Sequence, residues 1–160
     1  MASEAVLATL RAGWAALEGI DGPKAVIGGL AMSAWNVARY TRDADVLVAI
    51  DAGEVDGLVR TLASAGFRAK HDPALRMIDG QGIIQFLFQP LDALLPFQFD
   101  VLLAGSTFQR EAIDRAVPRS LPDDGVEIRV VRPDDLIVIK LLAGRIIDRA
   151  DAAMLLRENR

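Results

Sequence analysis

The sequence contains no cysteine and a single histidine, His71. The first absence excludes a disulfide scaffold, a cysteine nucleophile and a cysteine-ligated zinc site, and the second excludes a cage of several histidines around a metal. Any metal chemistry must therefore use carboxylates, which favour hard ions such as Mg²⁺ or Mn²⁺. His71 itself stands beside Asp72 and Pro73, a context typical of a loop.

Long apolar runs are also absent, although 52% of the 160 residues are hydrophobic. No window reaches the roughly 18 uninterrupted apolar residues of a membrane-spanning helix. Near the N-terminus, Glu4 and Arg11 fall within a helical pattern and no basic region precedes it, so no signal peptide is expected. We therefore expect one domain over residues 1–160, located in the cytoplasm and not associated with a membrane.

Neither sign of charge is in large excess. The chain has 18 Lys and Arg against 22 Asp and Glu, a formal net charge of −4, and the two signs are interleaved. This balance argues against a strongly basic nucleic-acid-binding surface as the dominant feature, while it leaves room for a local basic patch. The high apolar content and low net charge indicate a folded chain and not a disordered one.

Apolar periodicity predicts an α/β (α+β) fold, with a mixed β-sheet flanked by helices. An N-terminal helix (1–20) precedes a sheet core (24–131), and C-terminal helices (133–157) follow. Within this plan the expected helices cover 4–18, 30–37, a segment from Val55 to Leu62, 108–116, 133–143 and 146–157. The expected strands cover 25–27, 43–50, 67–70, 76–78, 83–88, 97–103 and 126–131, with a hairpin turn at 79–82.

Three aspartates are the first candidates for chemistry. Asp43 and Asp45 begin a strand at positions i and i+2, which places both side chains on one face about 6.5 Å apart. They repel each other unless a cation lies between them, the alternative being a solvated loop before the strand. Asp100 lies within the apolar strand 97–103, where an unpaired charge is costly. It either faces the same cation site or pairs with an arginine. Three such carboxylates can hold two divalent ions about 3.5–4 Å apart.

Gly28 and Gly29 follow a short buried strand and precede a helix. Glycines at such a turn let the backbone approach a phosphate, and the helix N-terminus then offers free N–H groups. The alternative is an ordinary tight turn.

Several charged residues have two interpretations. Arg39 and Arg42 either bind phosphate or are solvated. Lys140 stands among apolar neighbours in the helix 133–143. Spacings of three and four residues in the last helix predict a surface ion-pair network among Arg145, Asp148, Arg149 and Asp151.

Together these residues resemble a known family. Val26-Ile27-Gly28-Gly29, followed thirteen residues later by Asp43-Ala44-Asp45, looks like the signature of the nucleotidyltransferase superfamily with the polymerase-beta-like fold. The segment 39–48 resembles the AbiEii-type branch of toxin-like bacterial nucleotidyltransferases. Asp100 is similar to that family's third catalytic carboxylate. The segment 133–145, with Asp148 and Asp151, resembles the C-terminal helical motif of the branch. The resemblance spans residues 24–157.

The resemblance implies a nucleotidyltransferase fold and roles for individual residues. Gly28 and Gly29 would contact the triphosphate of an NTP substrate. Asp43 and Asp45 would ligate Mg²⁺ or Mn²⁺, and Asp100 would ligate the catalytic metal and help deprotonate the acceptor. Lys140 would face the phosphates or the nucleotide.

One departure concerns the glycine turn. Many members carry Gly-Ser there, and because Gly29 takes the place of the serine, Ser33 is the candidate for supplying the hydroxyl.

The leading functional hypothesis is a metal-dependent nucleotidyltransferase that moves NMP from an NTP to an acceptor hydroxyl or phosphate. RNA, tRNA and protein are candidate acceptors. The alternative is a non-catalytic module that binds a nucleotide or a partner, as one half of a toxin–antitoxin pair with an antitoxin partner. The apolar excess and the amphipathic terminal helices also raise the hypothesis of a homo-oligomer.

Overall fold

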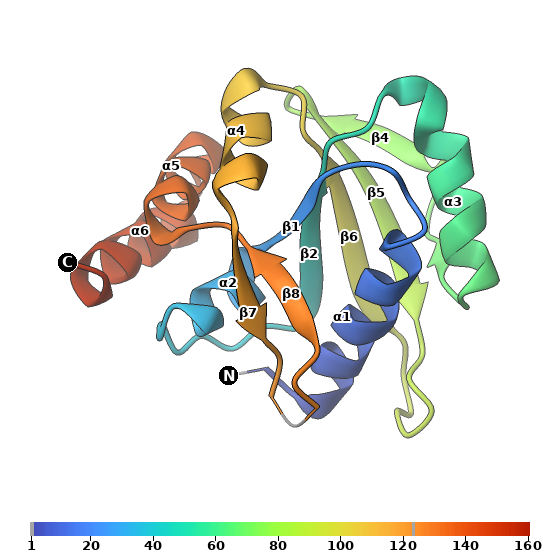
Figure 1. Cartoon of the computed structure of the whole chain (residues 1–160), viewed down its shortest axis with the longest axis horizontal. Helices are drawn as coiled ribbons and strands as arrows, with labels where there is room; N and C mark the ends of the chain where they lie inside the picture. Colours follow the sequence, from blue (N-terminus) through green and yellow to red (C-terminus); the bar gives the residue numbers. More distant parts are fainter. Residues whose placement is uncertain (1, 123) are drawn as a thin grey trace.

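The computed structural model describes residues 2–122 and 124–160. Within them a mixed sheet of eight strands is flanked by six α-helices and one short 3-10 helix, which confirms the expected fold class (Figure 1). The helices are α1 (Glu4–Leu17), α2 (Gly28–Ala34), η1 (Ala52–Glu54), α3 (Val55–Ser64), α4 (Thr107–Arg115), α5 (Pro133–Ala143) and α6 (Ile146–Glu158). The strands are β1 (Lys24–Ile27), β2 (Asp43–Val48), β3 (Arg68–Ala69), β4 (Leu75–Ile78), β5 (Gln81–Phe88), β6 (Phe97–Leu103), β7 (Val117–Ser120) and β8 (Glu127–Val130).

Local sequence signals account for several helix ends. The Ser3 hydroxyl caps α1 by accepting a hydrogen bond from the Val6 amide at 3.3 Å. Pro133 occupies the first turn of α5, where its missing N–H costs nothing. Gly144 ends α5 with a φ of +72°, a left-handed conformation that favours glycine.

The central strands set the position of the carboxylates. The sheet order is β3-β5-β6-β2-β1-β8-β7, and β4 pairs with β5. β2 runs antiparallel to β1 and parallel to β6, with Asp45 opposite Ile27 on one side and Asp100 on the other. Asp43 stands opposite Gln98. This register therefore brings the end of β1 and the middle of β6 to either side of Asp45.

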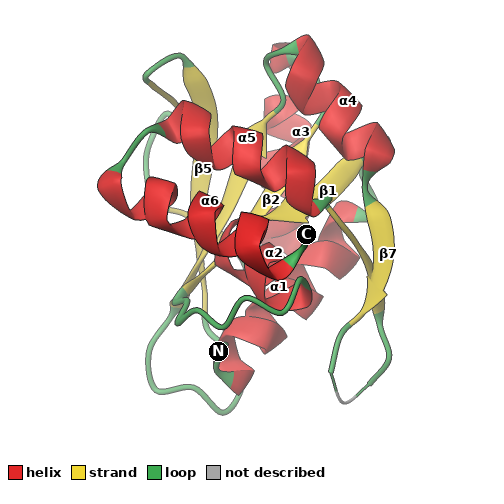
Figure 2. Ribbon diagram, turned by 90° about the vertical axis from the view of Figure 1, so that its left-hand side faces the viewer, coloured by secondary structure: helices red, strands yellow, loops and turns green. Residues whose placement is uncertain are grey.

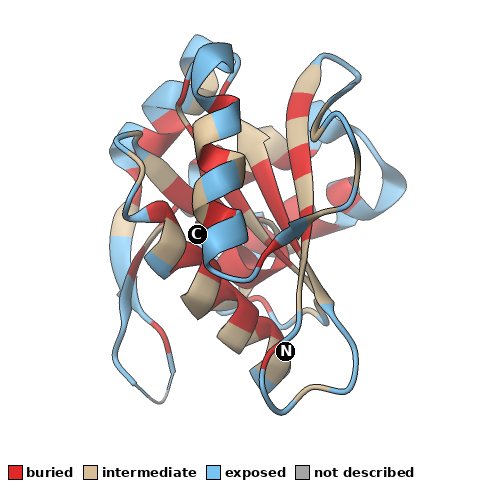
Figure 3. Ribbon diagram, turned by 90° about the vertical axis from the view of Figure 1, so that its right-hand side faces the viewer, coloured by how far each residue is buried: buried red, intermediate tan, exposed pale blue. Residues whose placement is uncertain are grey.

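The two faces of the sheet are covered differently. Helices α1 and α3 pack on the apolar face, where Phe99 is fully buried and contacts the ring of Phe67 at 5.2 Å between centroids. Helices α5 and α6 lie as an antiparallel pair on the other side (Figure 2). Buried residues concentrate on the strands and on the inward turns of the helices, and the outward turns are exposed (Figure 3).

The sequence did not predict β7. Pro118 lies within this strand, and three of its four residues are exposed. Because β7 is at the edge of the sheet and pairs only with β8, it needs neither a complete set of backbone donors nor two apolar faces. Elsewhere the differences are short: α2 begins at Gly28, β2 ends at Val48, and β3 has two residues.

Candidate functional site

A cleft of about 450 Å³ lies between the polar face of the sheet, helix α5 and the segment 39–43. This volume falls in the range of small-molecule pockets. Most of the residues singled out from the sequence line it, together with several found only in the structure: Ile27, Gly28, Gly29, Arg39, Tyr40, Thr41, Arg42, Asp43, Asp45, Asp100, Leu102, Leu136, Ile139, Lys140, Ala143, Arg145 and Asp148. The structure thus places the glycine pair, the three aspartates and Lys140 around one space.

Asp45 is the most perturbed carboxylate in this cleft. Loss of hydration and the negative charges of Asp100 and Asp43 together raise its pKa to about 7, although the charges of Lys140 and Arg145 oppose the rise. The side chain is still partly exposed to solvent in the cleft. At neutral pH Asp45 is therefore a carboxylate whose charge is poorly compensated by the protein.

Asp100 shares this environment from the neighbouring strand and is only 7% exposed. Burial raises its pKa to about 6, although hydrogen bonds from Gln98 and Gln85 oppose the rise. The Gln98 side-chain amide donates to Asp100 Oδ2 at 3.0 Å. The other carboxylate oxygen, Oδ1, is buried without a hydrogen-bond partner. An unpaired buried carboxylate oxygen is costly, so this atom is poised to receive a cation.

The chemistry of this donor set fits a divalent ion. Among the residues that the structure describes, no three histidine, cysteine, aspartate or glutamate side chains converge into a preformed metal cage. Nevertheless Asp45 and Asp100 stand opposite each other on adjacent strands, with raised pKa values and one unpartnered oxygen. Carboxylate oxygens that repel one another in a polar cleft are the ligands that Mg²⁺ and Mn²⁺ prefer.

The glycine pair packs directly on the carboxylates. Gly28 has a φ of +69°, and a Cβ atom added there would overlap the carboxylate of Asp45. A Cβ atom added at Gly29 would come within 2.8 Å of Thr41 Oγ1. Both positions therefore exclude a side chain, which brings the backbone of the β1–α2 turn against the base of the cleft.

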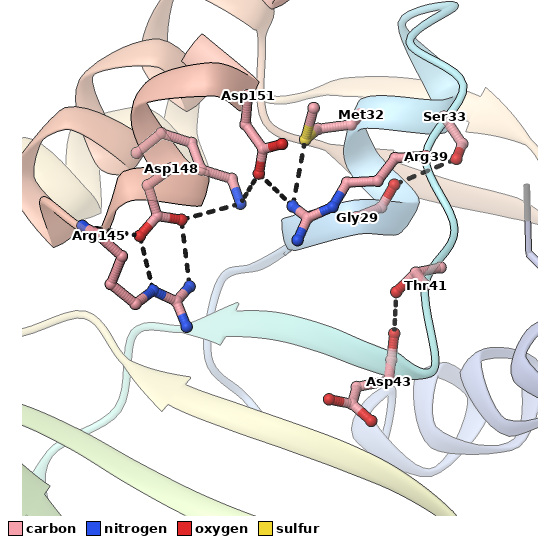
Figure 4. Close-up of polar contacts among 10 residues, drawn as sticks. Gly29, Met32, Ser33, Arg39, Thr41, Asp43, Arg145, Asp148 and Asp151 are labelled. Atoms are coloured by element: carbon pink, nitrogen blue, oxygen red, sulfur yellow. Dashed lines mark hydrogen bonds and ion pairs between the residues drawn. The ribbon is translucent and has the colours of Figure 1, made fainter.

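Ser33 does not face the cleft, contrary to the sequence-based prediction. Its hydroxyl donates to the carbonyl oxygen of Gly29 at 3.2 Å within helix α2 (Figure 4). The reason is the helical position: four residues after Gly29, the hydroxyl reaches the preceding turn. Thr41 lines the cleft instead, and its hydroxyl donates to the carbonyl oxygen of Asp43 at 3.0 Å.

A second cluster of charges borders the cleft, and we call it the ion cluster: Arg39, Lys140, Arg145, Asp148 and Asp151. Lys140 Nζ lies 2.9 Å from Asp151 Oδ2 and 3.3 Å from Asp148 Oδ1 (Figure 4). Arg39 also contacts Asp151, and Arg145 donates through two nitrogens to Asp148 at 2.7 and 3.1 Å. The cluster joins α5, α6 and the segment after α2.

This geometry bears on two expectations. Lys140 lines the cleft, where the prediction of a phosphate-facing cation needs it, but it is only 7% exposed and its Nζ contacts both Asp148 and Asp151. Asp148 and Asp151 are at most 1% exposed and do not form a surface network. Burial alone would raise the pKa of Asp148, but the hydrogen bond from Arg145 and the charge of Lys140 lower it.

The cations with accessible side chains in the cleft are arginines. The side chain of Arg145 is 71% exposed while its guanidinium is held by Asp148. Arg42 is exposed, and Arg39 is partly exposed. From the sequence, Arg39 and Arg42 are candidate phosphate ligands, whereas Arg145 is predicted only as part of a surface ion-pair network. Its position directly after Gly144, which ends α5, is the signal that could have found it, because a helix end turns the chain toward a neighbouring element.

Helices long and apolar enough to cross a membrane do not occur in the described part of the chain. No protein-family model matches the sequence, and no curated protein does either.

Solved structures, by contrast, match over nearly the whole chain. An antigenic nucleotidyltransferase-like protein from Paracoccidioides brasiliensis matches with a TM-score of 0.60 and 19% identity, over 96% of this chain and 75% of its own. A candidate nucleotidyltransferase from Thermotoga maritima matches with a TM-score of 0.57 and 14% identity, over 96% and 93%. The chain has the nucleotidyltransferase fold.

A third neighbour with this fold is ANT(2″)-Ia in complex with adenylyl-2″-tobramycin. It matches with a TM-score of 0.54 and 20% identity, over 93% of this chain and 86% of its own. At these identities the similarity establishes the fold, and the AbiEii-type branch stays a prediction.

Proposed function

We propose that this protein is a metal-dependent nucleotidyltransferase that transfers NMP from an NTP to an acceptor hydroxyl or phosphate. One observation carries the proposal. Asp45 and Asp100 stand opposite each other on parallel strands at the cleft, beside Asp43, and Asp100 Oδ1 has no partner among the described residues. Nothing in a purely structural role accounts for three mutually repelling carboxylates at this place.

Asp43, Asp45 and Asp100 would hold Mg²⁺ or Mn²⁺. Bound there, the ions would neutralise the triphosphate and lower the pKa of the attacking hydroxyl. In the transfer itself, the acceptor oxygen attacks the α-phosphorus, the bond from that phosphorus to the bridging oxygen breaks, and pyrophosphate leaves. Asp100 would ligate the catalytic metal and help deprotonate the acceptor hydroxyl.

The remaining groups of the cleft would position the substrate. The backbone of Gly28 and Gly29, which lines the cleft and packs closely on Asp45 and Thr41, would lie against the triphosphate. Arg145 and Arg42 would contact phosphate oxygens, and Arg145 is already oriented by its two hydrogen bonds to Asp148.

The structural neighbours support this reaction class. The complex of ANT(2″)-Ia contains an adenylylated antibiotic, the product expected when a nucleotide is moved to a small-molecule acceptor. We keep the AbiEii-type branch within the proposal, because Lys140, Asp148 and Asp151 of its C-terminal motif meet in the ion cluster beside the aspartates. An antitoxin partner, a homo-oligomer and a cytoplasmic location stay predictions.

The test is transfer of label from α-labelled NTPs in the presence of Mg²⁺ or Mn²⁺, with RNA, protein and small-molecule acceptors offered in turn. We expect Asp45→Asn and Asp100→Asn to slow transfer by about 10²–10³-fold, the scale typical of removing one electrostatic stabiliser. Asp92→Asn, at an exposed loop position, is the matched control. Label incorporation that survives Asp45→Asn would refute the mechanism.

A thermal shift experiment, read together with the labelling test, distinguishes a non-catalytic nucleotide-binding module from an active transferase. If the chain only binds nucleotides, Mg²⁺ with one of the four NTPs will raise the melting temperature by mass action, and no acceptor will become labelled.

A further inference from the structure

The polar face of the sheet beyond Asp100 carries a second set of contacts that the proposed reaction does not use. Gln98 and Asp100 are two residues apart on β6, so their side chains share a face. Gln85 of β5 stands directly opposite Asp100, and Lys70 follows β3 and hydrogen-bonds to the backbone of Gln85. Three strands, β3, β5 and β6, thus bring polar side chains to one side of a single carboxylate.

Two glutamines flank Asp100. The Gln98 side-chain nitrogen donates to Asp100 Oδ2 at 3.0 Å, and Gln85, directly opposite Asp100 on β5, favours its charged form. Asp100 Oδ1 receives no hydrogen bond. The Gln98 donor therefore engages one oxygen of the carboxylate and leaves the other without a partner.

Each glutamine amide is in turn held by a second side chain. Lys70 Nζ donates to Gln98 Oε1 at 3.0 Å, and His71 Nε2 lies 3.1 Å from Gln85 Oε1. An amide can face Asp100 with either its nitrogen or its oxygen, and the wrong choice places two acceptors against each other. A cation or ring N–H bound to the amide oxygen selects the orientation in which the nitrogen faces Asp100.

We propose that Gln98 and Gln85, oriented by Lys70 and His71, are positioning residues that fix the Asp100 carboxylate and present its free Oδ1 to the divalent ion. This inference rests on the proposed function, since it names the support of the same metal site. We call the four residues the amide clamp. Side chains that orient a ligating carboxylate typically contribute 10–100-fold to metal affinity.

The clamp changes the interpretation of His71. The sequence indicated a loop residue, and the side chain does lie at the end of the short β3. Its ring nitrogen nevertheless contacts both Gln85 and Arg76 Nη1, the latter at 3.2 Å. A single ring nitrogen cannot donate to the glutamine and accept from the arginine at once, so binding of Gln85 requires the tautomer with hydrogen on Nε2.

The experiment measures metal binding directly, by following the melting temperature of the full chain against Mg²⁺ or Mn²⁺ concentration without nucleotide. Gln98→Met preserves the length of the side chain and removes its amide donor without introducing a charge. We expect its half-saturating metal concentration to rise about 10-fold or more. Lys70→Met should raise it less, and the double variant should show less than the product of the two effects, because both changes act through one hydrogen-bond chain.

Matched controls distinguish positioning from general damage. Gln89→Met alters an exposed loop glutamine, and Arg68→Met alters an exposed cation on β3, and neither should move the metal midpoint. Unchanged metal midpoints in Gln98→Met and Lys70→Met, with a wild type that binds metal, would overturn the clamp. A wild type that neither binds metal nor transfers label would instead overturn the proposed function. A metal-free melting temperature lowered in Gln98→Met with an unchanged metal midpoint would assign the glutamine a structural role only.

Discussion

Two groups of aspartates border one cleft, and their electrostatic surroundings are opposite. Asp148 and Asp151 face Lys140, Arg39 and Arg145 in the ion cluster, and the pKa of Asp148 is lowered. Asp45 and Asp100 face each other, and their pKa values rise to about 7 and about 6. The aspartates on one side of the cleft thus pair with cations of the protein, whereas those on the other side mainly face each other's negative charge.

The difference separates a structural site from a binding site. A cluster in which every charge has a partner is closed and fixes the elements that contribute to it. A cluster with excess charge of one sign is destabilising by itself, and under the proposed function a bound metal ion would stabilise it. Four variants test this distinction between the two groups of aspartates, from the largest expected effect on stability to the smallest.

Lys140→Met should produce the largest loss of stability. It removes the cation shared by two aspartates that are at most 1% exposed. Because Arg39 and Arg145 still contact these aspartates, the cost should lie toward the lower end of the about 3–5 kcal/mol typical of breaking a buried ion pair. Urea unfolding monitored by circular dichroism gives the change in the free energy of unfolding. Arg157→Met, which removes an exposed pair with Glu158, should cost less than about 1 kcal/mol. Equal losses in the two variants would show that the ion cluster is not a closed structural unit.

Gly28→Ala should cost about 3 kcal/mol, from a left-handed conformation and from overlap with the Asp45 carboxylate. Gly80→Ala is the control, because Gly80 has a φ of +79° and a Cβ there would meet nothing within 4 Å. The difference between the two unfolding free energies isolates the contact with Asp45. If the two variants lose the same stability, the glycine is required only for its backbone conformation.

Metal-free protein should lose stability as the pH rises from about 4 to about 7. The folded state holds protons on Asp45 and Asp100 that the unfolded chain releases near its ordinary pKa of 3.8, so the contribution of these groups is present at low pH and lost across that window. At about 1.4 kcal/mol per pKa unit and with partial solvent screening, the loss is about 2 kcal/mol.

Melting temperatures at pH 4.5–7.5, with EDTA, would measure this loss. Asp45→Asn should flatten the dependence and melt higher than wild type at pH 7, whereas the exposed Asp92→Asn should leave the dependence unchanged. A wild-type curve that rises between pH 5 and 7 would contradict the assignment.

Arg145→Met should have the smallest effect on stability, about 1 kcal/mol or less, because its side chain is 71% exposed and Lys140 still balances Asp148. If Arg145 contacts phosphate oxygens, the KM for NTP should nevertheless rise several-fold. Steady-state kinetics measured beside urea unfolding separates the two effects. An unchanged KM would remove Arg145 from the substrate site and leave it as part of the ion cluster alone.

The elements and site residues that the sequence predicts are those that depend on local sequence patterns. Apolar periodicity and capping residues located nearly every helix and strand. The glycine pair, Asp43 and Asp45 lie close together along the chain, and Asp100 is recognisable as a carboxylate within an apolar strand. The edge strand β7 escaped because Pro118 and its polar neighbours lack the alternation of a half-buried strand. The partners of Lys140 escaped for another reason: they lie on α6, and only the packing of α6 on α5 brings them to Lys140.

The amide clamp shows the same boundary within one site. Gln98 is two residues from Asp100, so a shared face follows from the strand period alone. The pairing of β5 with β6 places Gln85 opposite Asp100, and the pairing of β3 with β5 brings His71 to Gln85. No single segment of the sequence encodes these pairings.

Side chains of β6 alternate between the two faces of the sheet, so the face that each one occupies depends on the exact number of residues before it in the strand. Gln98, Asp100 and Leu102 point to the cleft side, while Phe99 and Val101 are fully buried on the other, where Phe99 lies directly against Gly13 of α1. One residue inserted within this strand would exchange the two sets and present an aromatic ring where a carboxylate is needed. Residues added to the exposed segment 89–96 would leave the strand in phase. Length can therefore vary freely just before β6, whereas within it only changes in steps of two would keep an oxygen ligand in the cleft.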